Sequence, residues 1–152
     1  MTGVLQAIDP EFERRVRESF ARQRVMSTIG ARLARVAPGE VDLELPWRED
    51  LTQQHGFLHA GVVAAVLDSA CGYAALSLMP AGAAVLSVEI KVNLLGPAST
   101  GTLRARGRVV RAGRTISVCT ADAHLQAGGD ERHVATMLGT MMTVRGREEL
   151  RD

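Results

Sequence analysis

The sequence is poor in cysteine and lysine, and it has no excess of charge of one sign. Its two cysteines, Cys71 and Cys119, lie in separate apolar stretches without zinc-ligand spacing, so we expect reduced, buried thiols and no disulfide framework. Lys91 is the only lysine beside 17 arginines. Eighteen basic and 17 acidic residues leave a net charge of +1, which favours neither nucleic acid nor an anionic membrane as a partner.

Signals for export and for membrane insertion are also missing. Residues 1–18 mix acidic and basic side chains and contain no apolar stretch before a small-residue cleavage site, so we expect a cytoplasmic protein. The longest apolar stretch, residues 60–79, carries Asp68 near its centre. A carboxylate at that position argues against a transmembrane helix.

Length and composition predict one folded domain. The chain has 152 residues, of which 46% are hydrophobic and 23% charged. We expect a single domain over residues 1–152, with an N-terminal helical segment at 1–30 and a tail at 146–152. The D-P-E sequence at 9–11 is a helix-start signal, so a helix should begin there and end before Gly30.

A buried helix and a sheet are predicted from the apolar patterns. Between residues 51 and 88 the only Asp, Glu, Lys or Arg is Asp68, so this stretch should be largely buried. Residues 60–79 are apolar on all sides and predict a long central helix. Strands are predicted at 31–37, 41–47, 86–94, 101–111, 114–125 and 131–144. The alternating strand at 86–94 should be half-buried. The short connections predict an α+β fold in which one curved antiparallel sheet wraps the helix.

The isolated acid in this apolar stretch is the first candidate for catalysis. Burying an ionised carboxylate costs several kcal/mol unless it is hydrogen-bonded or paired, and no basic residue lies within a helical turn or two of Asp68. Isolated buried acids concentrate at functional sites. The alternative is a structural carboxylate that caps a loop or pairs with an arginine from elsewhere.

The start of the predicted helix is the second candidate. Its first N–H groups have no intrahelical acceptor, so the Ala60 N–H could polarise a carbonyl oxygen, while Gly56 and Gly61 would allow a close approach of the ligand. An ordinary helix start with turn glycines is the alternative. Ala60 and Asp68 are eight positions apart, about 12 Å along the helix axis. Two antiparallel helices about a two-fold axis would bring them together, so we expect a homodimer with shared sites, which could pair further into a dimer of dimers.

Residues 53–100 resemble the hotdog-fold acyl-CoA thioesterases, most closely the branch of the phenylacetate-degradation (PaaI-like) thioesterase. The family motif is an amide residue, then H-G-G, then an acid seven positions after the last glycine. Here Gln53, His59-Ala60-Gly61 and Asp68 stand at those positions, and S-V-E-I-K-V-N-L-L-G-P-A-S-T-G matches the strand and turn that follow. Ala60 replaces a usual Gly, and Gln53 stands where this branch often has Asn.

The resemblance implies a hotdog fold and hydrolysis of an acyl-CoA or aryl-CoA thioester to the free acid and CoA. No metal or cofactor would be needed, since coenzyme A is part of the substrate. Asp68, from the opposite subunit, would be the nucleophile or the general base for water, and the Ala60 N–H would polarise the carbonyl. Gln53 would orient the water or the carbonyl, His59 would brace the helix start, and Ser87 would help the carboxylate to hold water. The residues expected to bind substrate are Gly61, Asn93, Arg111 and Arg114, the two arginines as partners for the phosphates of coenzyme A.

Several alternatives stay open. A zinc site at His55, His59 and Asp68 would lack the H-E-x-x-H acid, and Gly56 puts the two histidines outside regular helix. A hydratase or dehydratase would need a His and acid pair around a C–H bond. A non-catalytic acyl-CoA sensor would usually carry an added output domain. Acyl chain length, aromatic or aliphatic preference and CoA or carrier-protein thioesters are all left open. A solvated strand face is predicted for Arg104, Arg106 and Arg108.

Overall fold

The computed structural model describes residues 5–150 and contains one long helix, two shorter ones and six strands. In chain order the elements are α1 (Phe12–Arg22), α2 (Arg24–Ile29), β1 (Arg32–Ala37), β2 (Glu40–Pro46), η1 (Glu49–Leu51), α3 (Ala60–Leu76), β3 (Ala84–Leu94), β4 (Thr102–Arg111), β5 (Ile116–Ala127), β6 (Asp130–Val144) and η2 (Glu148–Leu150). The short 3₁₀ helix η2 lies in the predicted tail. Residues 1–4 of the predicted helical segment and 151–152 of the tail lie outside the described residues.

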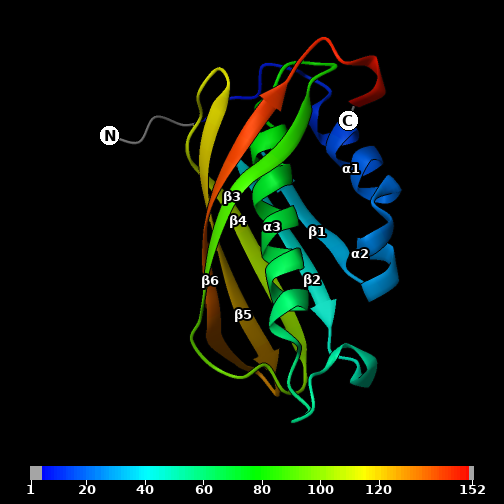
Figure 1. Cartoon of the computed structure of the whole chain (residues 1–152), viewed down its shortest axis with the longest axis vertical. Coiled ribbons are helices and arrows are strands. Elements are labelled where there is room, and N and C mark those ends of the chain that lie inside the picture. The colour runs from blue at the N-terminus through cyan, green and yellow to red at the C-terminus, as the bar shows by residue number, and fades with distance from the viewer. Residues whose placement is uncertain (1–4, 151–152) are drawn as a thin grey trace.

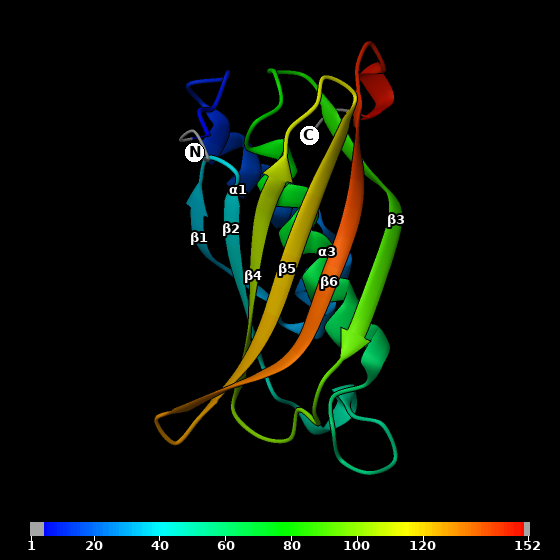
Figure 2. The same ribbon diagram turned by 90° about the vertical axis from the view of Figure 1, so that its left-hand side faces the viewer.

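All six strands form one antiparallel sheet in the order β1-β2-β4-β5-β6-β3. The predicted α+β class and antiparallel sheet are therefore confirmed. The sheet curves around α3, and α1 and α2 lie on the side of α3 that the sheet leaves open (Figure 1). Within the described residues β3 pairs with β6 alone, so it lies at one border of the sheet, as the turned view shows (Figure 2).

Close packing against the sheet explains the apolar residues on the side of α3 that the sheet covers. Val66, Leu67 and Ala70 are fully buried within the core that the sheet and helix share. The closest approach is at Gly107 in β4, where an added Cβ would lie 2.3 Å from the carbonyl oxygen of Ala70. Only glycine lets strand and helix touch there. No helix within residues 5–150 is long and apolar enough to cross a membrane.

The N-terminal segment differs from the prediction of one helix starting at the D-P-E sequence. The first helix begins at Phe12, because the Asp9 side chain accepts a 2.9 Å hydrogen bond from the Glu11 N–H and organises a turn before the helix. Gln23, with φ −76° and ψ 93°, is in an extended conformation and separates α1 from α2. The segment ends at Gly30 as predicted, with a left-handed φ of 80°.

One buried arginine fixes α1 against the end of α3. Arg15 donates hydrogen bonds to the carbonyl oxygens of Leu76 (3.1 Å), Met79 (2.6 Å) and Pro80 (2.5 Å). Its Nε lies 3.5 Å from Asp9, and both side chains are over nine-tenths buried. The charged group thus satisfies the carbonyl of the last residue of α3 and two carbonyls just beyond it.

The central helix is shorter than predicted, because it ends at Leu76 and not at residue 79. The Ser77 hydroxyl donates to the Ala74 carbonyl at 2.7 Å and accepts from the Gly39 N–H at 2.8 Å. These bonds join the helix terminus to the β1–β2 turn, so the chain leaves the helix there.

The prediction that the strand at 86–94 is half-buried is wrong, because most of β3 is exposed. The strand lies at the border of the sheet, where little packs against it. An extra residue, Val88, also forms a bulge between the ladder positions of Ser87 and Glu89. The bulge shifts the alternation by one residue, so polar Ser87 and apolar Ile90 both lie opposite buried residues of β6, on the side of the sheet that faces α3.

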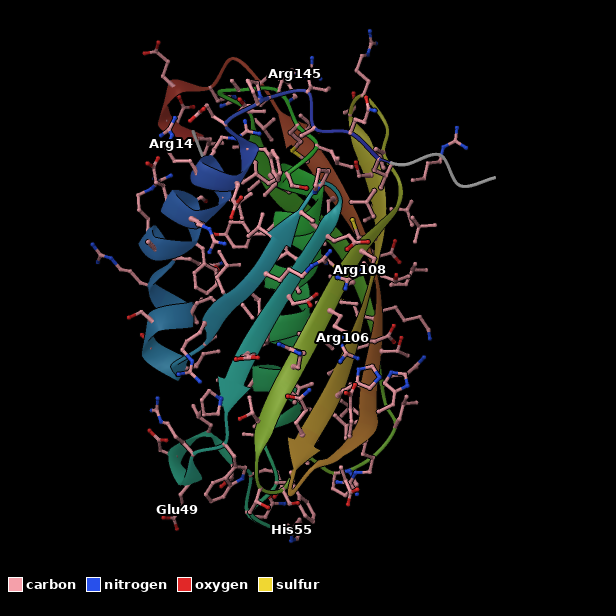
Figure 3. The ribbon with its side chains drawn as sticks, turned by 180° about the vertical axis from the view of Figure 1, so that it is seen from behind. Arg14, Glu49, His55, Arg106, Arg108 and Arg145 are labelled. Atoms are coloured by element: carbon pink, nitrogen blue, oxygen red, sulfur yellow. The ribbon has the colours of Figure 1, made fainter. Side chains whose placement is uncertain are left out.

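The arginines of β4 lie on the outer face of the sheet, as predicted, but their side chains are only 30% to 34% exposed, because each forms an ion pair. Leu103 and Ala105 are fully buried, while the arginines that alternate with them point outward, as Figure 3 shows for Arg106 and Arg108. Ion pairs with neighbouring strands are Arg104–Glu44 at 2.8 Å, Arg106–Glu131 at 2.6 Å and Arg108–Asp42 at 2.7 Å.

Candidate functional site

The carboxylate of Asp68 lies against the first half of β3. Asp68 projects from the middle of α3, and the Ser87 hydroxyl donates a 2.6 Å hydrogen bond to its Oδ1. Within one chain Asp68 is only half-buried, so it is less buried than the apolar stretch around it predicts. The reason is the fold: β3 is a border strand and α1 is held at the far end of α3, which leaves a gap over the carboxylate.

That gap is a cavity of about 280 Å³ between the α1–α2 junction, α3 and β3. Polar side chains make up most of its wall. The lining residues are Ser19, Arg22, Gln23, Asp68, Ser69, Gly72, Tyr73, Val85 and Ser87. We call this space the Asp68 cavity. It offers one carboxylate oxygen that is not taken by Ser87 and enough room for a water molecule and a small ligand.

The start of α3 has one backbone donor without a partner. His59 is the N-cap, and its Nδ1 accepts a 2.9 Å hydrogen bond from the Gly61 N–H, so the ring proton resides on Nε2. The His59 carbonyl accepts from the N–H groups of Val62 and Val63. Within residues 5–150 the Ala60 N–H makes no hydrogen bond. His59 therefore occupies the neighbouring donors and leaves that of Ala60 available.

Gly61 takes part in the N-terminal cap of α3, and this contact uses its main-chain N–H. An added Cβ would lie 3.1 Å from His59 Nδ1, and the Gly61 N–H is already bonded to that nitrogen. Gly56, with φ 81°, turns the loop before the helix. The role expected for Gly61 in substrate binding stays a prediction, and its main-chain donor is not free in this structure.

Gln53 lies in the loop that leads into α3. The loop is closed by backbone bonds from the Gln53 N–H to Phe57 O (2.8 Å) and from the Gly56 N–H to Gln53 O (3.0 Å), and the Gln53 side chain accepts from the His55 N–H. Gln53 and Ala60 line a second cavity of about 340 Å³. Its other lining residues are Phe57, Leu58, Val63, Leu94, Leu95, Gly96, Pro97, Ala98 and Val134. We call it the Ala60 cavity.

The candidate residues therefore form two groups that do not meet within one chain. Asp68 and Ser87 share one cavity, while Gln53 and Ala60 share the other. Ala60 and Asp68 are eight positions apart in α3, which is about 12 Å along the helix axis. One chain thus places the carboxylate of Asp68 and the free main-chain donor of Ala60 in separate cavities.

The remaining predicted substrate residues lie outside both cavities. Asn93 is exposed near the end of β3, and its side chain accepts a 3.1 Å hydrogen bond from Lys91. Arg111 and Arg114 are exposed around the β4–β5 turn. Arg145 donates to the Arg114 carbonyl at 3.3 Å.

The β4–β5 turn forms a separate basic cleft. The cleft is about 310 Å³ in volume and is lined by Arg114, Thr115, Thr143 and Arg145. Arg145 and the loop residue His55 lie at opposite ends of the long axis (Figure 3). The basic cleft is therefore remote from the loop that precedes α3 in the same chain.

Neither cysteine contributes a nucleophile. Cys71 and Cys119 are fully buried and free, as the sequence predicts. Burial raises the pKa of both thiols, so both are protonated at neutral pH.

Sequence reasoning missed most of the wall of the Asp68 cavity. Ser19, Arg22 and Gln23 come from the N-terminal helices, and Tyr73 comes from the turn of α3 beyond Asp68. No local pattern marks the first three, because their position depends on how Arg15 holds α1 against α3. Tyr73 is the chain's only tyrosine and sits in an apolar helix, which is the one signal that could have drawn attention to it.

Comparison with known proteins agrees with this architecture. A family model for the thioesterase superfamily matches residues 55–131, just over half of the chain. The human acyl-coenzyme A thioesterase 13 is 30% identical over 108 residues, covering 70% of this chain and 75% of that protein. The residues that the family model matches include both Ala60 and Asp68.

Solved structures extend the similarity to the fold. A thioesterase family protein from Silicibacter pomeroyi is 55% identical, with a TM-score of 0.87 over 89% of this chain and 99% of that one. The PaaI protein from the phenylacetic acid degradation operon of E. coli has a TM-score of 0.81 over 90% of this chain and 95% of that one, at 19% identity, which bears on the fold alone. The chain therefore belongs to the thioesterase superfamily and has its hotdog fold.

Proposed function

We propose that this protein hydrolyses an acyl-CoA thioester to the free acid and CoA, at sites that two copies of the chain share. The observation that carries the proposal is the pair of half-sites, one with the carboxylate of Asp68 and one with the unpartnered N–H of Ala60. A thioester carbonyl needs little more than these two groups, because its carbon is electrophilic and a thiolate leaves readily.

In the proposed reaction Asp68 acts as the general base. It removes a proton from a water molecule while the water oxygen bonds to the carbonyl carbon. Ser87 holds one carboxylate oxygen, so the other faces the water. When the tetrahedral intermediate collapses, the C–S bond breaks and the proton on Asp68 passes to the sulfur of CoA. The products are the carboxylic acid and the free thiol.

The main-chain donor stabilises the charge that grows on the carbonyl oxygen. The Ala60 N–H is at the positive end of α3 and makes no competing hydrogen bond within residues 5–150. His59 supports this role indirectly by capping the neighbouring N–H group. Gln53, on the wall of the same cavity, would orient the carbonyl or the water.

The arrangement of β3 supports sharing between two copies. Val85 and Ser87, at its start, line the Asp68 cavity, while Leu94 at its end lines the Ala60 cavity. If two β3 strands pair antiparallel about a two-fold axis, the start of one lies beside the end of the other. Each carboxylate half would then meet the main-chain donor of the partner.

The chemistry of β3 fits a protein interface. The strand lies at the sheet border, where its outer edge has no ladder partner within residues 5–150. Its apolar side chains Leu86, Val88, Ile90 and Leu94 are between 43% and 58% exposed. An open, apolar border strand favours association with another strand, and a second copy of this chain supplies one of matching length.

The phosphates of coenzyme A are assigned to the basic cleft. Arg114 and Arg145 line it, and Arg111 lies at the same turn. Guanidinium groups pair well with phosphate oxygens, and the threonine hydroxyls of the cleft add donors.

The test is thiol release from a panel of acyl-CoAs and aryl-CoAs. We expect the wild type to hydrolyse at least one member and Asp68→Asn to lose about a hundredfold or more in kcat, the scale of a positioned base. Asp130→Asn, at the exposed β5–β6 turn, is the matched control and should keep full activity. Undiminished release by Asp68→Asn, or no release by the wild type on any member, would overturn the proposal.

A further inference from the structure

We propose that the Asp68 cavity is the acyl pocket and that it selects a short acyl group carrying an oxygen substituent, either a hydroxyl or a carboxylate. This inference rests on the proposed function and specifies its substrate class. Gln23 and Arg22, from the α1–α2 junction, are the residues that would make the selection.

The Asp68 cavity is closed at one end, a short distance from Asp68. The Ser19 hydroxyl donates a 3.3 Å hydrogen bond to the Tyr73 hydroxyl, and both groups are buried, so α1 and α3 are bridged there. Tyr73 lies five residues beyond Asp68, roughly 7.5 Å along the helix axis. A cavity of that depth can hold a short acyl group. The pantetheine arm of CoA is too long for it and must extend toward solvent.

A glycine keeps the floor of the cavity open. Gly72 is inside α3, where glycine destabilises a helix relative to alanine. Apart from its chain neighbours and the backbone of its own helix, no heavy atom lies within 4 Å of where its Cβ would be. Nothing in the described fold requires the missing side chain, so the space it leaves is available to a ligand.

The wall of the cavity presents hydrogen-bonding groups. The Gln23 side chain accepts a 3.2 Å hydrogen bond from Ser69, which turns its amide toward α3. The Nε2 group of Gln23 makes no hydrogen bond to any residue of 5–150, and the Arg22 guanidinium has no ion pair with any of them. Both residues line the cavity, and both side chains carry hydrogen-bond donors.

Free donors in a pocket favour a ligand with acceptor oxygens. An alkyl group in this cavity would displace water from Gln23 and Arg22 without replacing its hydrogen bonds, and sites of this kind discriminate strongly against such analogues. A hydroxyl or a carboxylate would replace them. The guanidinium of Arg22 distinguishes the two substituents, because it gains an ion pair only with the carboxylate.

The test compares acyl-CoAs that differ only in oxygen content. 3-Hydroxybutyryl-CoA is paired with isovaleryl-CoA, in which a methyl replaces the hydroxyl, and glutaryl-CoA is paired with 5-methylhexanoyl-CoA, in which two methyls replace the carboxylate oxygens. For at least one pair we expect kcat/KM to favour the oxygenated member by about tenfold or more.

Substitutions in the wall of the Asp68 cavity test whether these residues cause the preference for oxygenated acyl groups. Gln23→Leu should remove most of the preference by lowering kcat/KM for the oxygenated member and sparing its alkyl partner. Arg22→Gln should lower kcat/KM for glutaryl-CoA alone. Gly72→Leu should exclude all four substrates while acetyl-CoA, if hydrolysed by the wild type, is retained. Arg24→Gln, an exposed arginine beside Gln23 that does not line the cavity, is the matched control and should change nothing.

Each contrary outcome has a distinct meaning. Equal or better hydrolysis of both alkyl members by the wild type would overturn the acyl-pocket inference and leave the thioesterase proposal standing. The same holds if only long-chain acyl-CoAs are hydrolysed. An equal loss on all substrates in Gln23→Leu would assign the amide to the pantetheine arm and overturn the inference. Release from no acyl-CoA at all would overturn the proposed function itself.

Discussion

Ser87 Oγ donates a 2.6 Å hydrogen bond to Asp68 Oδ1, and this contact joins the middle of α3 to the first half of β3. A hydrogen bond to a charged group contributes roughly 1.5 to 3 kcal/mol. We expect Ser87→Ala to lower kcat by about tenfold to a hundredfold, because the carboxylate loses its fixed orientation. Steady-state kinetics would measure it, with the exposed Ser27→Ala as control. An unchanged kcat in Ser87→Ala would show that this hydrogen bond does not contribute to catalysis.

Replacing Ala60 with proline tests the main-chain donor without removing a side-chain function. Proline is favoured at the first position of a helix, and His59, with ψ 138°, already has the extended conformation that precedes proline. Ala60→Pro should therefore fold normally and lose about a hundredfold to a thousandfold in kcat, as expected for an oxyanion donor. Ala60→Gly keeps the N–H and should stay close to wild type. Full activity in a folded Ala60→Pro would exclude the donor.

Mixing two inactive variants tests the shared site. Asp68→Asn and Ala60→Pro subunits, unfolded together and refolded, should form hybrid dimers with one intact and one doubly defective site. Random mixing should restore about a quarter of wild-type activity. If both groups acted within one chain, the mixture would show no more activity than either variant alone.

The buried arginine of α1 should dominate the stability of the N-terminal segment. Arg15→Met leaves Asp9 without its charge partner and removes the donors to three carbonyls at the end of α3. We expect the free energy of unfolding in urea to fall by about 3 kcal/mol. Arg14→Met removes only exposed ion pairs and should have little effect. Equal stability of the two variants would contradict this assignment.

Two glycines should respond to alanine in opposite directions. Gly107→Ala places a methyl group 2.3 Å from the Ala70 carbonyl, so the helix and strand must separate, and stability should fall by about 2 kcal/mol. Gly72→Ala meets no neighbour and removes a helix-weakening residue, so stability should rise by up to about 1 kcal/mol. Thermal unfolding of both variants would measure the contrast, and destabilisation of similar size at both positions would refute it.

The sequence predicted the fold well where the pattern is local and continuous. The apolar stretch around Asp68 and the alternating strands after it appear as predicted within a few residues. The order of strands was beyond reach, because the pairing of β3 with β6 joins segments far apart in the chain. The exposure of β3 was also mispredicted, because an alternating pattern does not reveal whether anything covers the strand or whether Val88 forms a bulge.

The site was predictable only in part for a similar reason. Asp68 is marked by its isolation in an apolar stretch and Ala60 by its place at the start of the predicted helix, whereas Gln53 is implied only by the family resemblance; all three line cavities. Gln23 is an ordinary polar residue in an Arg-rich helical segment, and only the tertiary contact with Ser69 turns it toward the cavity. Residues that shape a pocket from a neighbouring element have no local signature.

If two copies pair along β3 as proposed, the stability of this protein depends on its own concentration. An isolated copy would expose a row of unsatisfied amide and carbonyl groups together with apolar side chains, so folding and self-association are coupled by mass action. Dilution should lower the melting temperature as well as the turnover per chain. The amount of the protein in a cell would then affect both its stability and its proposed activity, because a scarce chain would be less stable and less active than an abundant one.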